Sequence, residues 1–534
     1  MGIIKVNNSY DRKENNSISL REAVAYVEGK LKKEELTPMQ LQQIDEDEEQ
    51  DKYHILLCQN TTLAEKLTIH DCPSGVSVMI DGNGHTITGE ADNDGFLVKS
   101  SNVTFQNVHF RNFKIAIFLA SEKDLSDVGI DGCTFQNDRL YDVLAGAIES
   151  NSRMQDIRIV NCDFYPRAMI PVVFSACFDL EGGKNLENCL LEHVLFQNNR
   201  IVGRNGEDQG EGLCVYCAAD MSNMYNGSLN LLADYESHGI IQNCAVRDVQ
   251  VLDSLFYQVG DCALGFCTAS PGVNCIMENV VIRHNIIRQC LGAMGVGCAD
   301  LMWGGECHGN IFRNAVIEDN QIYAAEFDKR EPINAIGVNS SRIEWKSAKI
   351  YDNHVCNVII RNNEIHGTDG GIVVEAMHAL LDAPQPAVIA DSSTRNVSIE
   401  NNKFYDCRFP VKVFAANAEG RYDSLGGVAF VDDPDMEYST LAERNSIDKI
   451  AIRGNYASGF EMFLIIAAAH VYGHVYAKDN TVGADVVVED NMIRKGRLTF
   501  IHKYYITDEI LMDDTVGTGN KSLCDVRFYF TGEE

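Results

Sequence analysis

One phrase recurs along the chain and limits the folds that it can adopt. It consists of alternating β-branched residues, then a polar pair, then an apolar residue. Clear copies occupy 103–110, 128–135, 157–164, 280–287, 358–365, 397–404 and 486–493. The alternation has period two and therefore predicts strands. Because the copies lie too far apart for hairpins and no helical pattern separates them, we expect a solenoid built coil by coil.

A column of asparagines supports this interpretation. Aligning the copies places these residues at one turn position: Asn199, Asn285, Asn320, Asn363, Asn402, Asn455 and Asn491. Asparagine tolerates the left-handed backbone conformation, and we expect it there. Each side-chain amide can also bond the equivalent amide one coil away. Earlier coils have Val108, Cys133 and Cys162 in this column, so the ladder is expected to start partway along.

A second strand follows each phrase and carries a glycine-rich outer face. Its alternation predicts two outward columns. The first contains Gly265, Gly295, Gly337 and Val373, and the second contains Cys267, Gly297, Asn339 and Glu375. Glycine inside a strand usually marks close approach by another group. We therefore expect a bare glycine floor beside Glu375.

The opening of the chain adds a family resemblance. The motif Ser19-Leu20-Arg21-Glu22-Ala23, followed by Ile-Asp-Gly-Asn-Gly at 80–84, resembles the right-handed parallel β-helix proteins, the pectate-lyase-like superfamily, in its carbohydrate-active branch. The resemblance implies an all-β, single-stranded right-handed parallel β-helix with an N-terminal capping helix. Ser19 and Glu22 form a capping box that begins this helix.

Two regions are expected. Residues 1–75 would form the N-terminal cap, with a helix at about 20–34 and an acidic linker. Residues 76–534 would form the parallel β-helix, with long loops on one flank. The fold alone leaves the activity open, because it hosts hydrolases, lyases, epimerases and non-catalytic adhesins.

The charge balance excludes some partners. The chain has 45 Lys+Arg against 77 Asp+Glu, a formal net charge of -32. A field of this sign repels nucleic acid and anionic membranes. No apolar run approaches the length of a membrane span. We expect a carbohydrate substrate, neither nucleic acid nor membrane as partner, and leave the oligomeric state open.

The 18 cysteines show no disulfide framework. Cys214 and Cys217 form a lone CxxC, but strand alternation points them to opposite faces, so we expect no metal and no cofactor. Buried free thiols suit a reducing compartment. The first residues contain no apolar signal segment. The predicted location is therefore the cytoplasm, with secretion by an anaerobe, from a sequence lacking its signal peptide, as the alternative.

Long excursions after the second strands should emerge side by side and wall a groove along one flank. Trp303 and Trp345 fall in two of these loops, about one coil apart, and would provide a stacking surface for sugar rings. Four further residues near this flank are expected to bind substrate: Asn339, His308, Asp261 and Glu211.

Carboxylates crowd the same flank. Glu375 is the acid in the outward column beside the glycine floor, and we predict that it is one catalytic carboxyl. Its partner would be Glu306 or Asp300, ahead of Asp369. Glycoside hydrolysis needs two carboxyl groups, and neighbouring coils lie about 4.8 Å apart. Acids one or two coils apart therefore suit the chemistry.

These observations favour a glycoside hydrolase, or a related transglycosylase, that cleaves a neutral oligo- or polysaccharide by a two-carboxylate mechanism. One alternative is a polysaccharide lyase or epimerase, which would need cationic groups against the substrate carboxylate and a base for the C5 proton. The other is a non-catalytic carbohydrate-binding or adhesin-like β-helix.

Overall fold

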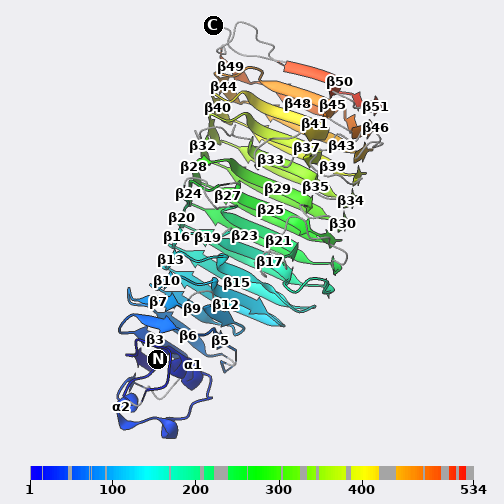
Figure 1. Ribbon diagram of the computed structural model, residues 1–534. Helices are drawn as coiled ribbons and strands as arrows, with labels where there is room; N and C mark the ends of the chain where they lie inside the picture. Colours follow the sequence, from blue (N-terminus) through cyan, green and yellow to red (C-terminus); the bar gives the residue numbers. More distant parts are fainter. Residues whose placement is uncertain are drawn as a thin grey trace.

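The chain folds into one stack of coils, which the computed structural model shows rising from the N-terminal to the C-terminal end (Figure 1). The structure describes residues 2–14, 16–45, 51–70, 72–73, 75–90, 93–167, 170–204, 210–221, 239–260, 262–301, 305–324, 334–343, 348–380, 387–419, 440–472, 475–494, 504–512 and 516–524.

Four sheets run along the stack, and each coil adds one strand to each sheet that it crosses. In the described residues sheet 1 is 17-stranded, sheets 2 and 3 are 13-stranded, and sheet 4 is 9-stranded. Equivalent strands of successive coils pair in parallel, as where Val281 pairs with Val316. The predicted right-handed parallel β-helix is confirmed.

Sheet 1 contains β1 (Gly2–Val6), β2 (Ile44–Asp45), β3 (Lys52–Leu57), β6 (Ser77–Asp81), β9 (Val103–Gln106), β12 (Asp124–Asp131), β15 (Arg153–Val160), β19 (Leu190–Gln197), β23 (Ala245–Leu252), β27 (Ile276–Arg283), β31 (Ile311–Glu318), β35 (His354–Arg361), β39 (Ser393–Glu400), β43 (Ser446–Arg453), β47 (Thr481–Val482), β48 (Val486–Glu489) and β52 (Lys521–Ser522).

Sheet 2 contains β4 (Thr61–Leu63), β7 (Thr86–Gly89), β10 (His109–Arg111), β13 (Thr134–Gln136), β16 (Asp163–Tyr165), β20 (Arg200–Val202), β24 (Leu255–Tyr257), β28 (Ile286–Cys290), β32 (Gln321–Ala324), β36 (Glu364–His366), β40 (Lys403–Tyr405), β44 (Tyr456–Ser458) and β49 (Met492–Ile493).

Sheet 3 contains β5 (Leu67–Ile69), β8 (Phe96–Val98), β11 (Ile115–Ser121), β14 (Tyr141–Ala147), β17 (Val172–Asp179), β21 (Leu213–Asp220), β25 (Cys262–Ser270), β29 (Gly292–Leu301), β33 (Asn334–Ile343), β37 (Gly370–Leu380), β41 (Phe409–Glu419), β45 (Leu464–Tyr472) and β50 (Tyr504–Met512).

Sheet 4 contains β18 (Leu186–Glu187), β22 (Ile241–Gln242), β26 (Gly272–Val273), β30 (Gly305–His308), β34 (Ala348–Tyr351), β38 (Ala387–Ala390), β42 (Thr440–Glu443), β46 (Val475–Lys478) and β51 (Val516–Thr518).

The N-terminal cap contains helix α1 (Leu20–Val27), a 3-10 turn (Lys33–Glu35) and helix α2 (Pro38–Leu41). Ser19 and Glu22 form the predicted capping box, and α1 buries an apolar stripe in the same core as β1 and β3. The helix ends earlier than 34. Parallel pairing of β3 with both β1 and β6 carries sheet 1 through residues that were predicted to form the cap.

The asparagine ladder is present as predicted. Asn320 Nδ2 donates to Asn363 Oδ1 at 2.9 Å, and Asn363 Nδ2 donates to Asn402 Oδ1 at 3.0 Å. The left-handed conformation, however, belongs to the residue before each ladder asparagine, such as Asn362 with φ 56°. The ladder position itself faces inward, where its amide satisfies backbone groups that water cannot reach.

A second ladder, which the sequence analysis missed, follows the turn between sheets 4 and 1. Asn310 Nδ2 donates to Asn353 Oδ1 at 2.9 Å, and Asn445 Nδ2 donates to Asn480 Oδ1 at 3.1 Å. Earlier coils fill this inner turn with Cys189, and the structure has all 18 cysteines as free thiols. No helix among the described residues is long and apolar enough to cross a membrane.

Candidate functional site

The outer face of sheet 3 carries the two predicted columns. Gly265, Gly295, Gly337 and Val373 are successive register partners, as are Cys267, Gly297, Asn339 and Glu375. The inward set is also as predicted, because Ile372 and Val374 belong to the interior core cluster and Val373 does not. Glu375 is therefore held on an outer face by a strand whose alternate residues anchor it in the core.

The strand then departs from strict alternation. Ala376 and Met377 both lie in the buried core, so two consecutive residues face inward. This step returns His378 to the outer face, where its Nδ1 lies 3.0 Å from Glu375 Oε2. A repeating inward pair thus places an imidazole and a carboxylate side by side on one strand.

Glu375 is fixed by more than His378. Asn417, on the next coil, donates to Glu375 Oε1, and His470 Nδ1 in turn contacts Asn417 Oδ1 at 2.7 Å. The His470 ring stacks on Phe414 with centroids 4.7 Å apart. Both Glu375 and Asn417 are almost completely buried. The result is a hydrogen-bonded row across β37, β41 and β45, which we call the histidine row (Glu375, His378, Asn417 and His470).

This arrangement sets the proton on His378. A Glu375 carboxylate accepts from a hydrogen on the facing Nδ1, the nitrogen that also lies 3.4 Å from Asn417 Nδ2. Nε2 then holds the lone pair, as in a carboxylate-oriented general base. Because Glu375 contacts both His378 and Asn417, its carboxylate orients the imidazole more readily than it reaches a substrate.

Charged groups flank the histidine row. Arg342 is the register partner of His378 one coil earlier, and its Nη1 lies 3.5 Å from Asp300 Oδ2. On the other side Lys412 Nζ lies 3.0 Å from Asp369 Oδ2. Asp300 and Asp369 are therefore ion-pair partners of cations on the same face as the row.

Glu211 lies further along the same face. Its Oε2 accepts from Tyr216 Oη at 3.3 Å. Burial, followed by charges that include Glu211 and Asp300, raises the pKa of the Tyr216 phenol well above its ordinary value. The charges of two predicted site carboxylates therefore contribute to the raised pKa of this phenol.

The glycine floor is partly occupied. A Cβ on Gly265 would meet Glu211 Oε1 at 3.1 Å, and one on Gly297 would meet Asn339 Oδ1 at 2.5 Å. The glycines make room for polar side chains of the same face. The floor is thus less bare than predicted at these two positions.

Glu306 and His308 are not where the sequence analysis placed them. Both lie on β30 of sheet 4, not in a loop beside Glu375. Tyr351 donates to Glu306 Oε1 at 2.8 Å and stacks on His308 with centroids 4.5 Å apart. The structure does not bring Glu306 to the histidine row, because a four-residue strand replaces part of the predicted loop.

Three predicted site residues, Trp303, Trp345 and Asp261, lie outside the described residues, as do parts of the predicted groove walls. A surface hollow of about 570 Å³ lies elsewhere, against Asn161, Asn198 and Asp253. These residues belong to turns between sheets 1 and 2, and none of them is a member of the histidine row.

Sequence reasoning missed His378, Asn417 and His470. Strict alternation from Glu375 points His378 into the core, so the pattern gave no reason to select it. The sequence signal that could have found them runs from coil to coil. One register column contains, in successive coils, Arg342, His378, Asn417 and His470.

One group of side chains in the described part of the chain has the spacing of a metal site. It consists of Cys177, Cys189 and Cys244, whose Sγ atoms all lie within 4.8 Å of one another. Cys214 and Cys217, the CxxC pair, do not form a site. Cys214 belongs to an apolar cluster outside the solenoid and Cys217 to the interior core, as alternation predicted.

Comparisons with known proteins find neither a matching family model nor a curated protein of similar sequence. Similar solved structures include the A-module of a mannuronan C-5 epimerase from Azotobacter vinelandii, 11% identical over 86% of this chain and 91% of that one, with a TM-score of 0.26.

A mutant tailspike protein of E. coli bacteriophage HK620 in complex with a pentasaccharide is 9% identical, over 89% of this chain and 74% of its own, with a TM-score of 0.26. An alginate lyase complex is 12% identical, over 99% and 88%, with a TM-score of 0.25. At these identities the likeness concerns the fold alone.

Proposed function

We propose that the protein is a carbohydrate-active enzyme that removes a proton from an acidic sugar on the outer face of sheet 3, as a polysaccharide lyase or epimerase does. The observation that carries the proposal is the Glu375–His378 pair with Arg342 as the register partner of His378. The pair supplies an oriented base, and Arg342 supplies a positive charge one coil away.

The chemistry follows from these groups. A uronate has an acidic C5–H next to its carboxylate, and cationic groups stabilise the negative charge that develops when this proton leaves. His378 Nε2 would take the proton while Glu375 holds the hydrogen on Nδ1. A lyase then breaks the C4–O bond and forms a C4=C5 double bond, whereas an epimerase returns a proton to the other side of C5.

The repeat supports a polymeric substrate. Successive coils present polar side chains about 4.8 Å apart along the solenoid, which suits a chain of regularly spaced sugar units. This proposal replaces the neutral substrate expected from the net charge. Arg342 and Lys412, each ion-paired with an aspartate, are the cations on this face that a substrate carboxylate would meet.

Glycoside hydrolysis is the second candidate, favoured by a different observation. Glu211 Oε2 accepts from Tyr216 Oη at 3.3 Å, and Asp300, on β29, is the register partner of Arg342, so both carboxyl groups lie along sheet 3. A two-carboxylate mechanism could use them. In that case Glu375 and His378 would have little part in turnover.

The test is activity on a panel of uronate-containing and neutral polysaccharides, followed by kinetics of His378→Gln and Glu375→Gln. We expect ultraviolet-absorbing unsaturated product or inverted C5 centres from a uronate polymer. Loss of acid–base help should lower kcat by about 10² to 10⁴ in His378→Gln. Glu375→Gln should lower kcat in the same direction, because it removes the group that orients the imidazole.

His366→Gln is the matched control. His366 Nε2 lies 2.8 Å from Glu364 Oε1, so the same pair of groups occurs on the outer face of sheet 2. Its substitution should leave kcat near the parental value. A folded His378→Gln protein that turns over at the parental rate would show that the histidine row is not catalytic.

A further inference from the structure

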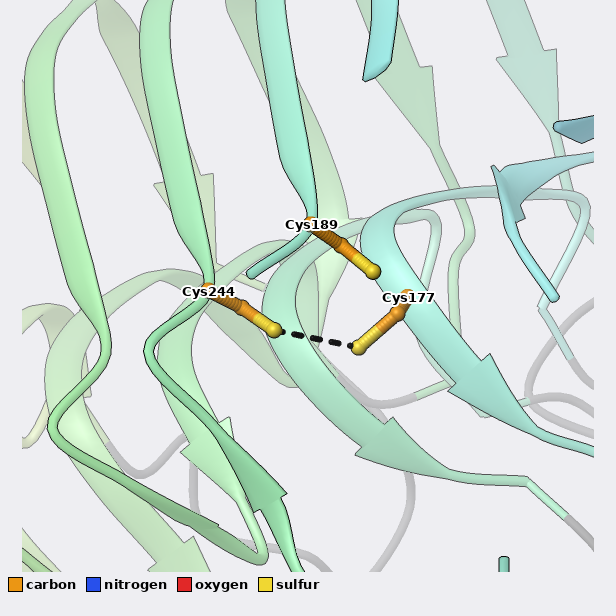
Figure 2. A group of neighbouring side chains, drawn as sticks. All are labelled: Cys177, Cys189 and Cys244. Carbon is orange, nitrogen blue, oxygen red and sulfur yellow. Dashed lines mark hydrogen bonds between the residues drawn. The ribbon is translucent and has the colours of Figure 1, made fainter. Parts of the chain in front are cut away.

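A second chemical site lies inside the solenoid, away from sheet 3's outer face. Cys177 is on β17, while Cys189 and Cys244 occupy the inner turn between sheets 4 and 1 in two successive coils. Their side chains point toward one another in Figure 2. All three are buried.

The spacing of the sulfur atoms fits a common ligand set. Cys177 Sγ and Cys244 Sγ are 3.4 Å apart, and all three Sγ atoms lie within 4.8 Å of one another. Zinc–sulfur bonds of about 2.3 Å place thiolate sulfurs roughly 4 Å apart around a shared ion. A shift of up to about an ångström would therefore let the three atoms surround one cation.

A simpler explanation is that these thiols only fill the core as small apolar groups. That explanation is sufficient for Cys275. That residue occupies the same turn column one coil further on, where its Sγ donates to the Val273 carbonyl at 3.5 Å. Cys177 differs because it comes from another sheet and meets the column at this level. Core packing alone does not require thiols from two sheets to meet at one point.

Charge selects the kind of cation. Three thiolates around a divalent ion leave one net negative charge in the apolar core, whereas a monovalent ion leaves two. Buried charge is costly, so the divalent ion is favoured. Sulfur ligands select thiophilic metals over calcium or magnesium. The backbone N–H of Ser152, which bonds to Cys189, helps to stabilise a thiolate.

We propose that Cys177, Cys189 and Cys244 together bind one thiophilic divalent cation of the zinc class inside the solenoid. Binding releases three thiol protons and forms three metal–sulfur bonds. It joins two coils at the turn where the asparagine ladder has not yet begun, so the ion would take over the inter-coil link that Asn310 and Asn353 make later.

Protonation opposes this binding. Hydrogen bonds with Cys189 and Cys244, and then burial, hold the pKa of the Cys177 thiol well above its ordinary value. Metal binding must displace thiol protons, so affinity should fall as the pH is lowered.

The experiment measures metal directly. The full chain is refolded with excess Zn²⁺, freed of unbound metal, and assayed for zinc by mass spectrometry. We expect about one zinc per chain in the parent, a small fraction of that in Cys189→Ala, and the parental content in Cys290→Ala. Cys290 is a buried thiol whose Sγ meets only backbone carbonyls, which makes it the matched control.

Refolding the parent with Cd²⁺ provides a measurement that does not depend on a variant folding. Thiolate-to-cadmium charge-transfer absorption should appear in the near ultraviolet at one equivalent. A parent that takes up neither zinc nor cadmium would overturn the proposal. So would a Cys177–Cys244 disulfide found in the unreduced parent, or zinc retained in full by Cys189→Ala.

Discussion

Asp138 and Asp142 form a buried pair of carboxyl groups near the start of sheet 3. Both are fully buried, and Asp138 accepts from the Phe113 N–H at 2.8 Å. Burial is the main cause that raises the pKa of Asp138 to about 7. Burial and then the charge of Asp138 raise the pKa of Asp142 well above its ordinary value. The pair therefore keeps a proton in the folded protein at mildly acidic pH.

This pair should make stability depend on pH. An unfolded aspartate has a pKa of about 3.9, so between that value and about 7 the folded state binds more protons than the unfolded state. The free energy of unfolding should therefore fall as the pH rises through this window. Asp142→Asn leaves an amide that can donate to Asp138, and should raise the free energy of unfolding at pH 8 by about 2 kcal/mol.

Urea unfolding of both proteins at pH 5 and pH 8 checks this prediction. The exposed Asp485→Asn is the control, and should reproduce the parental pH dependence. If the Asp142→Asn protein loses as much stability as the parent from pH 5 to pH 8, the carboxyl pair does not hold the extra proton of the folded state.

At the scale of single elements, the inner turn between sheets 1 and 2 links each coil to the next. Asn363 Oδ1 accepts from the backbone N–H and the side-chain amide of Asn320. Its own Nδ2 donates to Asn402 Oδ1 and to the Ile317 carbonyl at 2.9 Å. One side chain therefore satisfies buried groups on both sides of its coil.

Asn363→Leu should be strongly destabilising. It leaves several buried donors and acceptors without partners, at roughly 1 to 3 kcal/mol for each group. Chemical unfolding should show a loss of several kcal/mol, while Lys403→Leu, at an exposed position on the adjacent strand β40, should change little. An unchanged unfolding midpoint in Asn363→Leu would contradict the role assigned to the ladder.

The elements also show how far sequence patterns reach. The alternating parts of long strands, such as β37 from Ile372 to Glu375, were predictable because one face packs in the core. Sheet 4 was not, because strands such as β30 have only four residues and present no measurable period. The inward pair Ala376 and Met377 was equally hidden, since each residue type suits either face.

At the scale of the molecule, the repeat decides which parts of the site could be foreseen. Glu375 and Asn339 were placed in the correct column, because register propagates from coil to coil. His378 was missed because one extra inward residue reverses the alternation after Glu375. Glu306 was assigned to the wrong surface because the short sheet 4 strands turn the chain onto another face.

The solenoid also separates the two proposed chemistries. The histidine row lies on the outer side of sheet 3, where Glu375, His378 and Asn417 are nearly buried, whereas the three thiols lie inside the core. Metal loading should therefore affect stability, and the outer face should decide turnover.

The most direct test of the proposed function is the proton NMR spectrum of products formed from a uronate polymer in D₂O. Abstraction of the C5 proton predicts that this signal is lost, either because deuterium replaces hydrogen or because a C4=C5 double bond forms. The same change should be absent with His378→Gln. New non-reducing ends that keep an intact C5–H and show no C4=C5 double bond would instead indicate hydrolysis, and would contradict the assignment of His378 as the catalytic base.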